Sequence, residues 1–236
     1  MKNIKRFIVP SLFLLSIVFN ACEKLPLQKG FKYTQSFYDN KIDMSVMDFM
    51  ESRTDMFSGM LAAIEYVDTD PEYKDVKEMY SQPGNTYLLL HDNALINLEQ
   101  EFSFFVRNPI VDTNPASPDY NIPFKGTDWS QYDKKVVADL LRYHVLKGTY
   151  DYKNLNSTAK WVDTYALSST NDSAKVYIYL EGTRDGHLYL NNYTGVNKDW
   201  VNIKPRTPDL HAKNGVIQVM NRYLLQPTRQ DIQNNK

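Results

Sequence analysis

Three segments of the chain place apolar residues at helical spacing. The first opens with Ser45 and Asp48, which fit a capping-box pattern, and runs through Phe49 and Met50. The second carries apolar residues that would share one helix face: Phe57, Met60, Leu61, Ile64 and Val67. The third covers residues 133–141 and repeats this spacing with Val136, Val137, Leu140 and Leu141. Each segment therefore predicts a helix.

Short β-branched and aromatic runs predict strands in much of the remaining chain. Residues 86–90 form a buried run that leads into a turn, where Asp92 and Asn93 supply capping side chains for a helix. Further strand-like runs lie at 143–144, 161–167, 175–181, 186–191 and 199–203. Asn214 and Gly215 separate two apolar runs, which predicts a tight hairpin because both residues tolerate φ > 0. Residues 101–132 hold four prolines and no period, and we expect a long functional or mobile loop there.

The alternation in residues 176–190 fixes how two of these strands pair. Aliphatic residues would all lie on one face only if the connection between the strands has an odd length: Val176, Ile178, Leu180, Leu188 and Leu190. A shift of one residue would turn one strand's aliphatic side chains to the other face, so the hydrophobic pattern selects the odd turn. Residues 184–186 then predict a three-residue loop with Gly186 in the left-handed conformation.

This pairing gathers aromatic residues on the opposite face of the hairpin. Tyr177, Tyr179, His187 and Tyr189 would lie together there, with Tyr193 as a further member. Rings with polar tips suit recognition of sugars or proteins, so these residues are the candidate binding site. The alternative interpretation is that another helix or loop covers the face, or that the tyrosines only reflect a strand preference.

The N-terminus has the features of a secretory signal. Lys2, Lys5 and Arg6 precede an apolar run over residues 7–19, which is shorter than the about 20 residues of a spanning helix. Ala21 and Cys22 follow, as at a bacterial lipoprotein cleavage site, and Cys22 is the only cysteine in the chain. We expect Cys22 to carry a lipid anchor, which gives the protein a membrane partner; the alternative is an unpaired cysteine in a secreted chain.

Charge and composition narrow the partners and the chemistry. Without residues 1–21 the chain has 24 Lys+Arg against 28 Asp+Glu, a net charge near −4, which argues against nucleic acid as a partner. The four histidines (91, 144, 187 and 211) are widely separated, and we expect no metal site. The sequence has no nucleophile elbow and no phosphate-binding or dinucleotide-binding loop. We expect no cofactor and no enzymatic activity.

Three segments resemble motifs of the fasciclin domain. Residues 214–219 (Asn-Gly-Val-Ile-Gln-Val) and 224–227 (Leu-Leu-Gln-Pro) are similar to the last motif of that family, and residues 140–148 to its Tyr-His motif. Residues 86–93 resemble the first motif, except that His91 stands where the family usually has proline. The resemblance implies an α+β, fasciclin-like fold with two packed β-sheets wedged with several helices. It also implies that Tyr143 and His144, like Asn214 and Gly215, are structural.

These observations predict the following organisation. A lipoprotein signal peptide covers residues 1–21, a membrane-tethering linker 22–44, a fasciclin-like domain 45–227, and a C-terminal tail 228–236. The N-terminal features predict a lipid-anchored protein of the cell envelope, on the surface or periplasmic face of the outer membrane, and the resemblance implies that it serves in adhesion or ligand binding. Its ligand would be a glycan or an envelope protein. The competing function is an accessory or scaffold lipoprotein of an outer-membrane nutrient-uptake complex.

Overall fold

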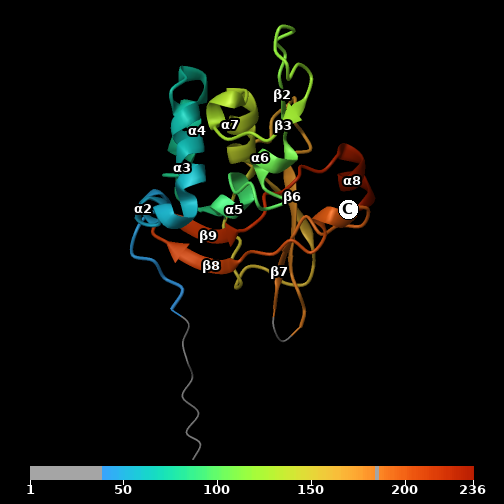
Figure 1. Ribbon diagram of the computed structural model, residues 1–236. Coiled ribbons are helices and arrows are strands. Elements are labelled where there is room, and N and C mark those ends of the chain that lie inside the picture. The colour runs from blue at the N-terminus through green and yellow to red at the C-terminus, as the bar shows by residue number, and fades with distance from the viewer. Residues whose placement is uncertain (1–38, 184–185) are drawn as a thin grey trace, which may run out of the picture. The chain divides into compact units, whose positions relative to one another are not determined.

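The computed structural model describes residues 39–183 and 186–236, and from Asn40 onward the chain forms one compact unit (Figure 1). The described part combines helices and sheets, so the predicted α+β class is confirmed. Its α-helices are α2 (Val46–Ser52), α3 (Thr54–Asp68), α4 (Lys74–Met79), α5 (Asp92–Leu95), α6 (Phe104–Arg107), α7 (Lys134–Tyr143) and α8 (Arg229–Asn234). Its 3₁₀ helices are η2 (Pro71–Tyr73), η3 (Trp129–Gln131) and η4 (Lys198–Trp200).

The three helices expected from the hydrophobic pattern are present as α2, α3 and α7. The capping box of α2 forms as predicted: the Ser45 hydroxyl accepts a hydrogen bond from the Asp48 N–H, and the Asp48 carboxylate accepts one from the Ser45 N–H. Helix α3 buries the apolar face that the sequence indicated, with these residues inside: Phe57, Met60, Ile64 and Val67. Helical periodicity is thus a sufficient signal for these elements.

The strands form two larger sheets and one short ribbon. The first sheet has the order β4 (Val145–Leu146), β1 (Asn85–Leu90), β9 (Gly215–Met220) and β8 (Thr207–Ala212). The second contains β5 (Lys160–Asp163), β6 (Lys175–Leu180) and β7 (Leu188–Leu190). The ribbon pairs β2 (Ile110–Val111) with β3 (Pro123–Phe124). A bridge between Leu146 and Thr164 joins the two larger sheets.

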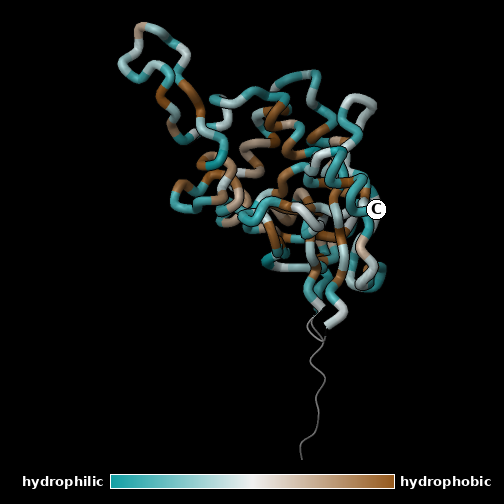
Figure 2. The backbone as a smooth tube through the Cα atoms, turned by 90° about the vertical axis from the view of Figure 1, so that its right-hand side faces the viewer, coloured by the Kyte–Doolittle hydropathy of each residue, from teal (hydrophilic) through white to brown (hydrophobic). Residues whose placement is uncertain are grey.

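Strand β1 lies at the centre of the first sheet. All six of its residues are buried, and it pairs parallel with β9 and antiparallel with β4. The continuous apolar run over residues 86–90 reflects this burial, because a strand covered on both faces has no polar alternation. Figure 2 shows the corresponding hydrophobic segments of the tube concentrated in the interior of the unit.

The β8–β9 hairpin differs from the expected turn. Ala212 pairs with Gly215, so Lys213 and Asn214 form the turn, and neither Asn214 nor Gly215 has a positive φ. The prediction that the turn needs φ > 0 at both residues was therefore wrong. The Asn214 side chain instead accepts a hydrogen bond from the Val46 N–H (2.9 Å) and donates one to the Tyr80 carbonyl (2.9 Å). It ties the turn to the start of α2 and the end of α4.

Gly215 is required by a close approach rather than by its backbone angles. A Cβ atom at this position would overlap the carbonyl oxygen of Asn85 on β1, and it would lie 2.7 Å from Cε2 of Tyr87. The carbonyl cannot move away, since it belongs to the central strand. Glycine here lets β9 approach β1 closely.

The prediction that Tyr143 and His144 form a strand was wrong. Tyr143 is the last residue of α7, His144 caps the helix, and β4 begins at Val145. The helical spacing that starts at Leu140 continues through both residues, which places them on the buried side of α7. Local preference for a strand is overridden by this packing.

The His144 imidazole is fully buried and uses both of its nitrogens within the fold. Nδ1 lies 2.7 Å from the Leu140 carbonyl oxygen and donates to it, while Nε2 accepts a hydrogen bond from the Leu224 N–H at 2.8 Å. Burial lowers the pKa of His144 to about 4. The neutral ring therefore connects the end of α7 to the segment that follows β9.

The hydroxyl of Tyr143 connects α7 to three other segments. It lies 3.0 Å from the Lys175 carbonyl and 3.3 Å from the Leu225 carbonyl, and it accepts a hydrogen bond from Asn191 Nδ2 at 2.9 Å. Buried polar groups of this kind normally have partners, and here the partners come from β6, the end of β7 and the C-terminal segment. These contacts support the structural interpretation of the Tyr-His pair.

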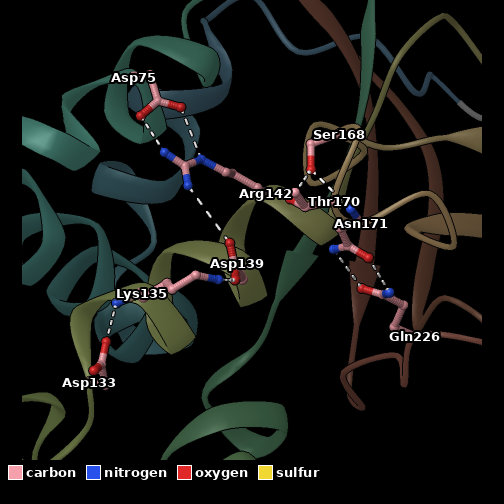
Figure 3. Close-up of polar contacts among 9 residues, drawn as sticks. All are labelled: Asp75, Asp133, Lys135, Asp139, Arg142, Ser168, Thr170, Asn171 and Gln226. Carbon is pink, nitrogen blue, oxygen red and sulfur yellow. Dashed lines mark hydrogen bonds and ion pairs between the residues drawn. The ribbon is translucent and has the colours of Figure 1, made fainter.

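Arg142 joins α7 to α4 just before this pair. Its Nε donates to Asp75 Oδ2 at 2.9 Å, a second nitrogen donates to Asp75 Oδ1, and Asp139 lies 3.8 Å away (Figure 3). The Arg142 side chain is 19% exposed and the Asp75 side chain 58% exposed, so water partly screens the pair, and its bidentate geometry is what favours it. The end of α7 is thereby held against α4.

Two further expectations about secondary structure were wrong. Residues 199–203 do not form a strand, because the Asn197 side chain caps η4 and Asn202 takes a positive φ of 55° that interrupts an extended chain. Only Ile203 pairs there, with Leu190. Residues 101–132 are not structureless, since they contain α6, β2, β3 and η3. Phe104, Phe105, Trp129 and Tyr132 pack together there, which anchors the segment on either side of its projecting loop.

The compact unit also includes residues that we expected to lie outside the domain. The Ile42 N–H donates to the His211 carbonyl (2.8 Å), and the Lys213 N–H donates to the Met44 carbonyl (3.0 Å). At the other end, residues 229–234 of the expected C-terminal tail form α8, and Thr228 and Asp231 make its capping box. Contacts on both sides thus extend the unit beyond residues 45 and 227.

Gly215→Val should be among the most destabilising single substitutions. The new side chain would overlap the Asn85 carbonyl and Tyr87, and overpacking of this kind typically costs about 1–3 kcal/mol. Urea unfolding of the purified protein measures the loss. Gly182→Ala is the matched control, because its Cβ would meet only ordinary contact with Ser157 at 3.5 Å. An unchanged midpoint for Gly215→Val would contradict the close approach of β1 and β9.

Burial of His144 should make the free energy of unfolding depend on pH in a range above the one in which ordinary carboxylates titrate. The unfolded chain binds a proton at the usual histidine pKa of 6.5, whereas the folded protein binds it only near 4, so stability falls as the pH drops through this window. The loss approaches about 3 kcal/mol at the acid end. His144→Gln should be less stable at neutral pH by about 1–3 kcal/mol and should lose this part of the pH dependence.

Urea unfolding across the pH window compares the parent with His144→Gln. His187→Gln, at an exposed histidine, is the matched control for loss of an imidazole. Parallel pH profiles for the parent and His144→Gln would show that His144 is not the buried, neutral ring described above.

Candidate functional site

The β5–β6–β7 sheet carries aromatic residues on the face opposite the core. Trp161 pairs with Tyr177 across β5 and β6, and Tyr179 pairs with Tyr189 across β6 and β7. Tyr177 and Tyr179 are two residues apart on β6, so all four side chains share one face. With two residues beyond the strands they form what we call the aromatic strip: Trp161, Tyr177, Tyr179, His187, Tyr189 and Tyr193.

Neighbouring rings in the aromatic strip lie in contact along its length. The ring centroids of Trp161 are 4.8 Å from Tyr177 and 5.4 Å from Tyr193. Tyr179 stacks on Tyr189 at 5.3 Å with an interplanar angle of 22°, and it lies 6.2 Å from Tyr177. These separations are those of favourable aromatic pairs, so each ring restrains its neighbours.

The two faces of this sheet differ in burial. Aliphatic residues on the inner face are no more than 1% exposed: Val176, Ile178, Leu188 and Leu190. The tryptophan and tyrosines of the aromatic strip are half-buried, and His187 is exposed. Ile178 pairs with Leu190 and Leu180 with Leu188, which confirms the predicted odd connection. The hydrophobic pattern alone therefore placed the tyrosines correctly on the outer face.

The connection itself is longer than predicted. The Glu181 N–H donates to the His187 carbonyl at 2.8 Å, so the turn spans residues 182–186 rather than 184–186. The expected loop would have placed Thr183 opposite His187. Gly186 does have the expected left-handed φ, 52°, while Arg184 and Asp185 lie outside the described residues.

Polar groups border the rings of the strip. Asn192 Nδ2 donates to the Tyr179 hydroxyl at 2.8 Å, and Lys204 Nζ lies 5.4 Å from the centroid of Tyr189. Burial, followed by the neighbouring Asp231 carboxylate, raises the pKa of Tyr193 to about 12. Tyr193 therefore keeps its proton near neutral pH and can donate a hydrogen bond.

The C-terminal segment that contains α8 contacts one end of the aromatic strip. Trp161 Nε1 donates to the Asn235 carbonyl at 2.9 Å, and the Asn235 side chain bonds the backbone of Thr194. The alternative interpretation, in which another element covers the outer face of the sheet, therefore holds at the Trp161 end. The covering element is the C-terminal segment, because Tyr193 and Trp161 both contact it.

The segment before α8 is fixed by a pair of side-chain amides. Asn171 Nδ2 donates to Gln226 Oε1 at 3.2 Å, and Gln226 Nε2 donates to Asn171 Oδ1 at 2.6 Å (Figure 3). Arg229 on α8 pairs with Asp172 beside them, with N–O 2.6 Å. These contacts hold the start of α8 next to the loop that precedes β6.

The remaining candidate residues lie elsewhere or outside the described residues. Tyr143, His144, Asn214 and Gly215 belong to the interior and to the β8–β9 hairpin, and they are not members of the aromatic strip. Cys22 lies outside the described residues. Within residues 39–183 and 186–236, no group of three His, Cys, Asp or Glu side chains is placed to hold a metal ion. No helix in those ranges is long and apolar enough to cross a membrane.

Sequence reasoning missed Trp161 as a member of the strip. It lies in a run that predicted a strand, but nothing in that run indicates which partner strand lies beside it. The antiparallel pairing of β5 with β6 places Trp161 opposite Tyr177. The available signal was the spacing of Trp161 and Asp163 around the buried Val162, which marks the outer face of β5.

Comparisons with known proteins bear on the fold and family. The family model for the fasciclin domain matches residues 122–226. A solved structure of a FAS1 domain pair from the insect cell adhesion molecule Fasciclin I is similar, with 16% identity and a TM-score of 0.43. That similarity covers 72% of this chain, and the chain spans 46% of the matched structure. A comparison with curated proteins found no match.

The family match includes both C-terminal motifs of the sequence, residues 140–148 and 214–226. A fasciclin domain indicates a role of the adhesion or ligand-binding type. The resemblance to the fasciclin family is therefore confirmed, over residues 122–226 of the chain.

Proposed function

We propose that this protein is a lipid-anchored, non-enzymatic ligand-binding protein of the cell envelope whose aromatic strip binds carbohydrate. The observation that carries the proposal is the row of contacting rings on the outer face of β5–β6–β7. The rings are half-buried and therefore held in place.

The chemistry of the strip suits a sugar. Flat rings stack against the C–H face of a sugar ring, while tyrosine hydroxyls can form hydrogen bonds with its hydroxyls. Tyrosine and tryptophan also offer a large contact area at low cost in conformational entropy. Contacts between neighbouring rings reduce this cost further, because the rings are ordered before the ligand arrives.

The strip contains features of binding rather than catalysis. Its ionisable members are tyrosines and one exposed histidine, and Tyr193 holds its proton at neutral pH. Placement in the envelope, on the surface or periplasmic face of the outer membrane, rests on the signal-like N-terminus and Cys22. The membrane would then be a partner through the anchor, and the acidic balance of the chain disfavours nucleic acid.

One feature favours the alternative, an accessory or scaffold lipoprotein of an outer-membrane nutrient-uptake complex. The β2–β3 ribbon and its loop project from the unit (Figures 1 and 2) and expose large apolar side chains: Val111, Tyr120, Ile122 and Phe124. Each of these is at least 42% exposed. A projecting apolar element of this kind suits a protein partner better than a sugar.

A Tyr179→Ala/Tyr189→Ala double variant separates these proposals. It removes the stacked pair at the uncovered end of the strip and should lose at least about tenfold in glycan affinity, since aromatic residues dominate many binding surfaces. Stability should fall by more than the about 0.5–1.5 kcal/mol that such a pair contributes, because the half-buried area of both rings is lost as well. A glycan array and a pull-down from envelope extract measure binding, and thermal unfolding measures stability.

Matched controls accompany this variant. Tyr179→Phe keeps the ring and should retain most binding, whereas Tyr120→Ala removes an exposed ring on the projecting loop. Glycan binding that survives in the double variant would contradict the role of the strip. If Tyr120→Ala no longer captures an envelope protein that the double variant still captures, the scaffold function is favoured.

The anchor is tested independently at Cys22. Cys22→Ala should abolish incorporation of labelled fatty acid and leave uncleaved precursor or soluble protein, because this cysteine is the sole candidate for lipidation. Labelling and fractionation of cells that express each form make the measurement. A variant that stays membrane-bound and still takes up the label would disprove the lipoprotein assignment.

A further inference from the structure

A pocket of about 240 Å³ lies beside the covered end of the aromatic strip. Its lining includes Asn191 and Tyr193 after β7, Val196 and Trp200 at η4, and Asp231 on α8. Pockets for drug-sized ligands are typically about 300–1,000 Å³, so this one suits a single small ring. The strip and the pocket share Tyr193, whose ring contacts Trp161 and Tyr177 in the strip.

The lining determines which ligands fit. Asp231 is the charged residue among the described residues that line it, and neither lysine, arginine nor histidine occurs in this set. An anionic ligand would thus meet a carboxylate with no compensating cation, which is unfavourable away from bulk water. Trp200 and Val196 add apolar surface, and the Asp231 carboxylate, which already accepts a hydrogen bond from the Tyr193 hydroxyl, can accept a further one from a ligand. This combination suits a neutral ring that carries hydroxyl groups.

The position of the pocket determines which part of a glycan would reach it. Tyr193 lies between the pocket and Tyr177, and from Tyr177 the strip continues to Tyr179 and Tyr189. Helix α8 closes the site beyond this point, since Asp231 lines the pocket and Trp161 is bonded to Asn235. A chain that lies along the strip would therefore meet the pocket with its end.

We propose that this pocket binds the terminal sugar of a neutral glycan, while the sugars that follow stack along the aromatic strip. The proposal rests on the proposed function and specifies it in two respects: the glycan is uncharged, and it is bound by its end. An open strip without a terminal pocket would bind internal sugars at many positions along a chain. Its affinity per chain would then rise with chain length, whereas end binding levels off once strip and pocket are filled.

The test uses the full mature protein and short and long members of the malto-, cello- and xylo-oligosaccharide series, with oligogalacturonides as acidic counterparts. Val196→Trp fills the pocket and should weaken binding of neutral oligosaccharides at least about tenfold. Val201→Trp is the matched control, because Val201 is exposed beside the pocket and does not line it. Asp231→Asn is a second variant, whose amide can still cap α8 while the pocket loses its charge.

Titrations followed by tryptophan fluorescence and calorimetry give the affinities, and thermal unfolding shows that the variants are folded. Support requires weakened binding in Val196→Trp, parent-like binding in Val201→Trp and an affinity that levels off with chain length. If Val196→Trp binds like the parent and Tyr179→Ala/Tyr189→Ala loses binding, the proposed role of the pocket is wrong while that of the aromatic strip stands. Preference of the parent for oligogalacturonides would also overturn it. A parent that binds no member of the panel would overturn both proposals.

Discussion

The parallel pairing of β1 with β9 is the contact on which the rest of the unit depends. It joins residues 85–90 to residues 215–220, so all the other strands and the helices from α5 to α7 lie on the chain between these two strands. Gly215 permits the approach, and the Asn214 side chain reaches from the same turn to α2 and α4. Because this pairing closes a long loop, its entropy cost must be offset by burial, and every residue of β1 is buried.

Much of the fold can be predicted from the hydrophobic and capping patterns within single segments. The exceptions are residues whose structure depends on contacts with segments far away in the sequence. The α2 capping box, the buried face of α3 and the uninterrupted apolar run of β1 could all be predicted, since each signal lies within one segment. Tyr143 and His144 were expected in a strand but belong to the end of α7, where Leu224, Lys175 and Asn191 bind their polar atoms. Gly215 was recognised as important for the wrong reason, because the obstructing carbonyl of Asn85 is far away in the sequence.

The candidate site was partly predictable for a related reason. The alternation of aliphatic and aromatic residues along β6 and β7 determines which face Tyr177, Tyr179 and Tyr189 occupy. Only a connection of odd length places the aliphatic side chains of both strands on the buried face. Trp161 could not be included without knowing that β5 pairs with β6, and the loop length depends on the backbone of residues 181–187. The pocket beside Tyr193 was beyond sequence reasoning, because its walls come from η4, α8 and the segment after β7.

The two faces of the β5–β6–β7 sheet have different roles: the inner face stabilises the fold, and the outer face is the proposed recognition surface. The inner face contributes aliphatic side chains to the core, where a loss of volume would destabilise the fold. The outer face consists of rings that contact chiefly one another, so substitutions there can change ligand preference at a small cost in stability. Helix α8 adds to this face without burying any residue of its own, and polar contacts at Arg229 and Asn235 hold it. A short helix attached in this way has little hydrophobic stabilisation, so its place beside the strip depends on these polar contacts.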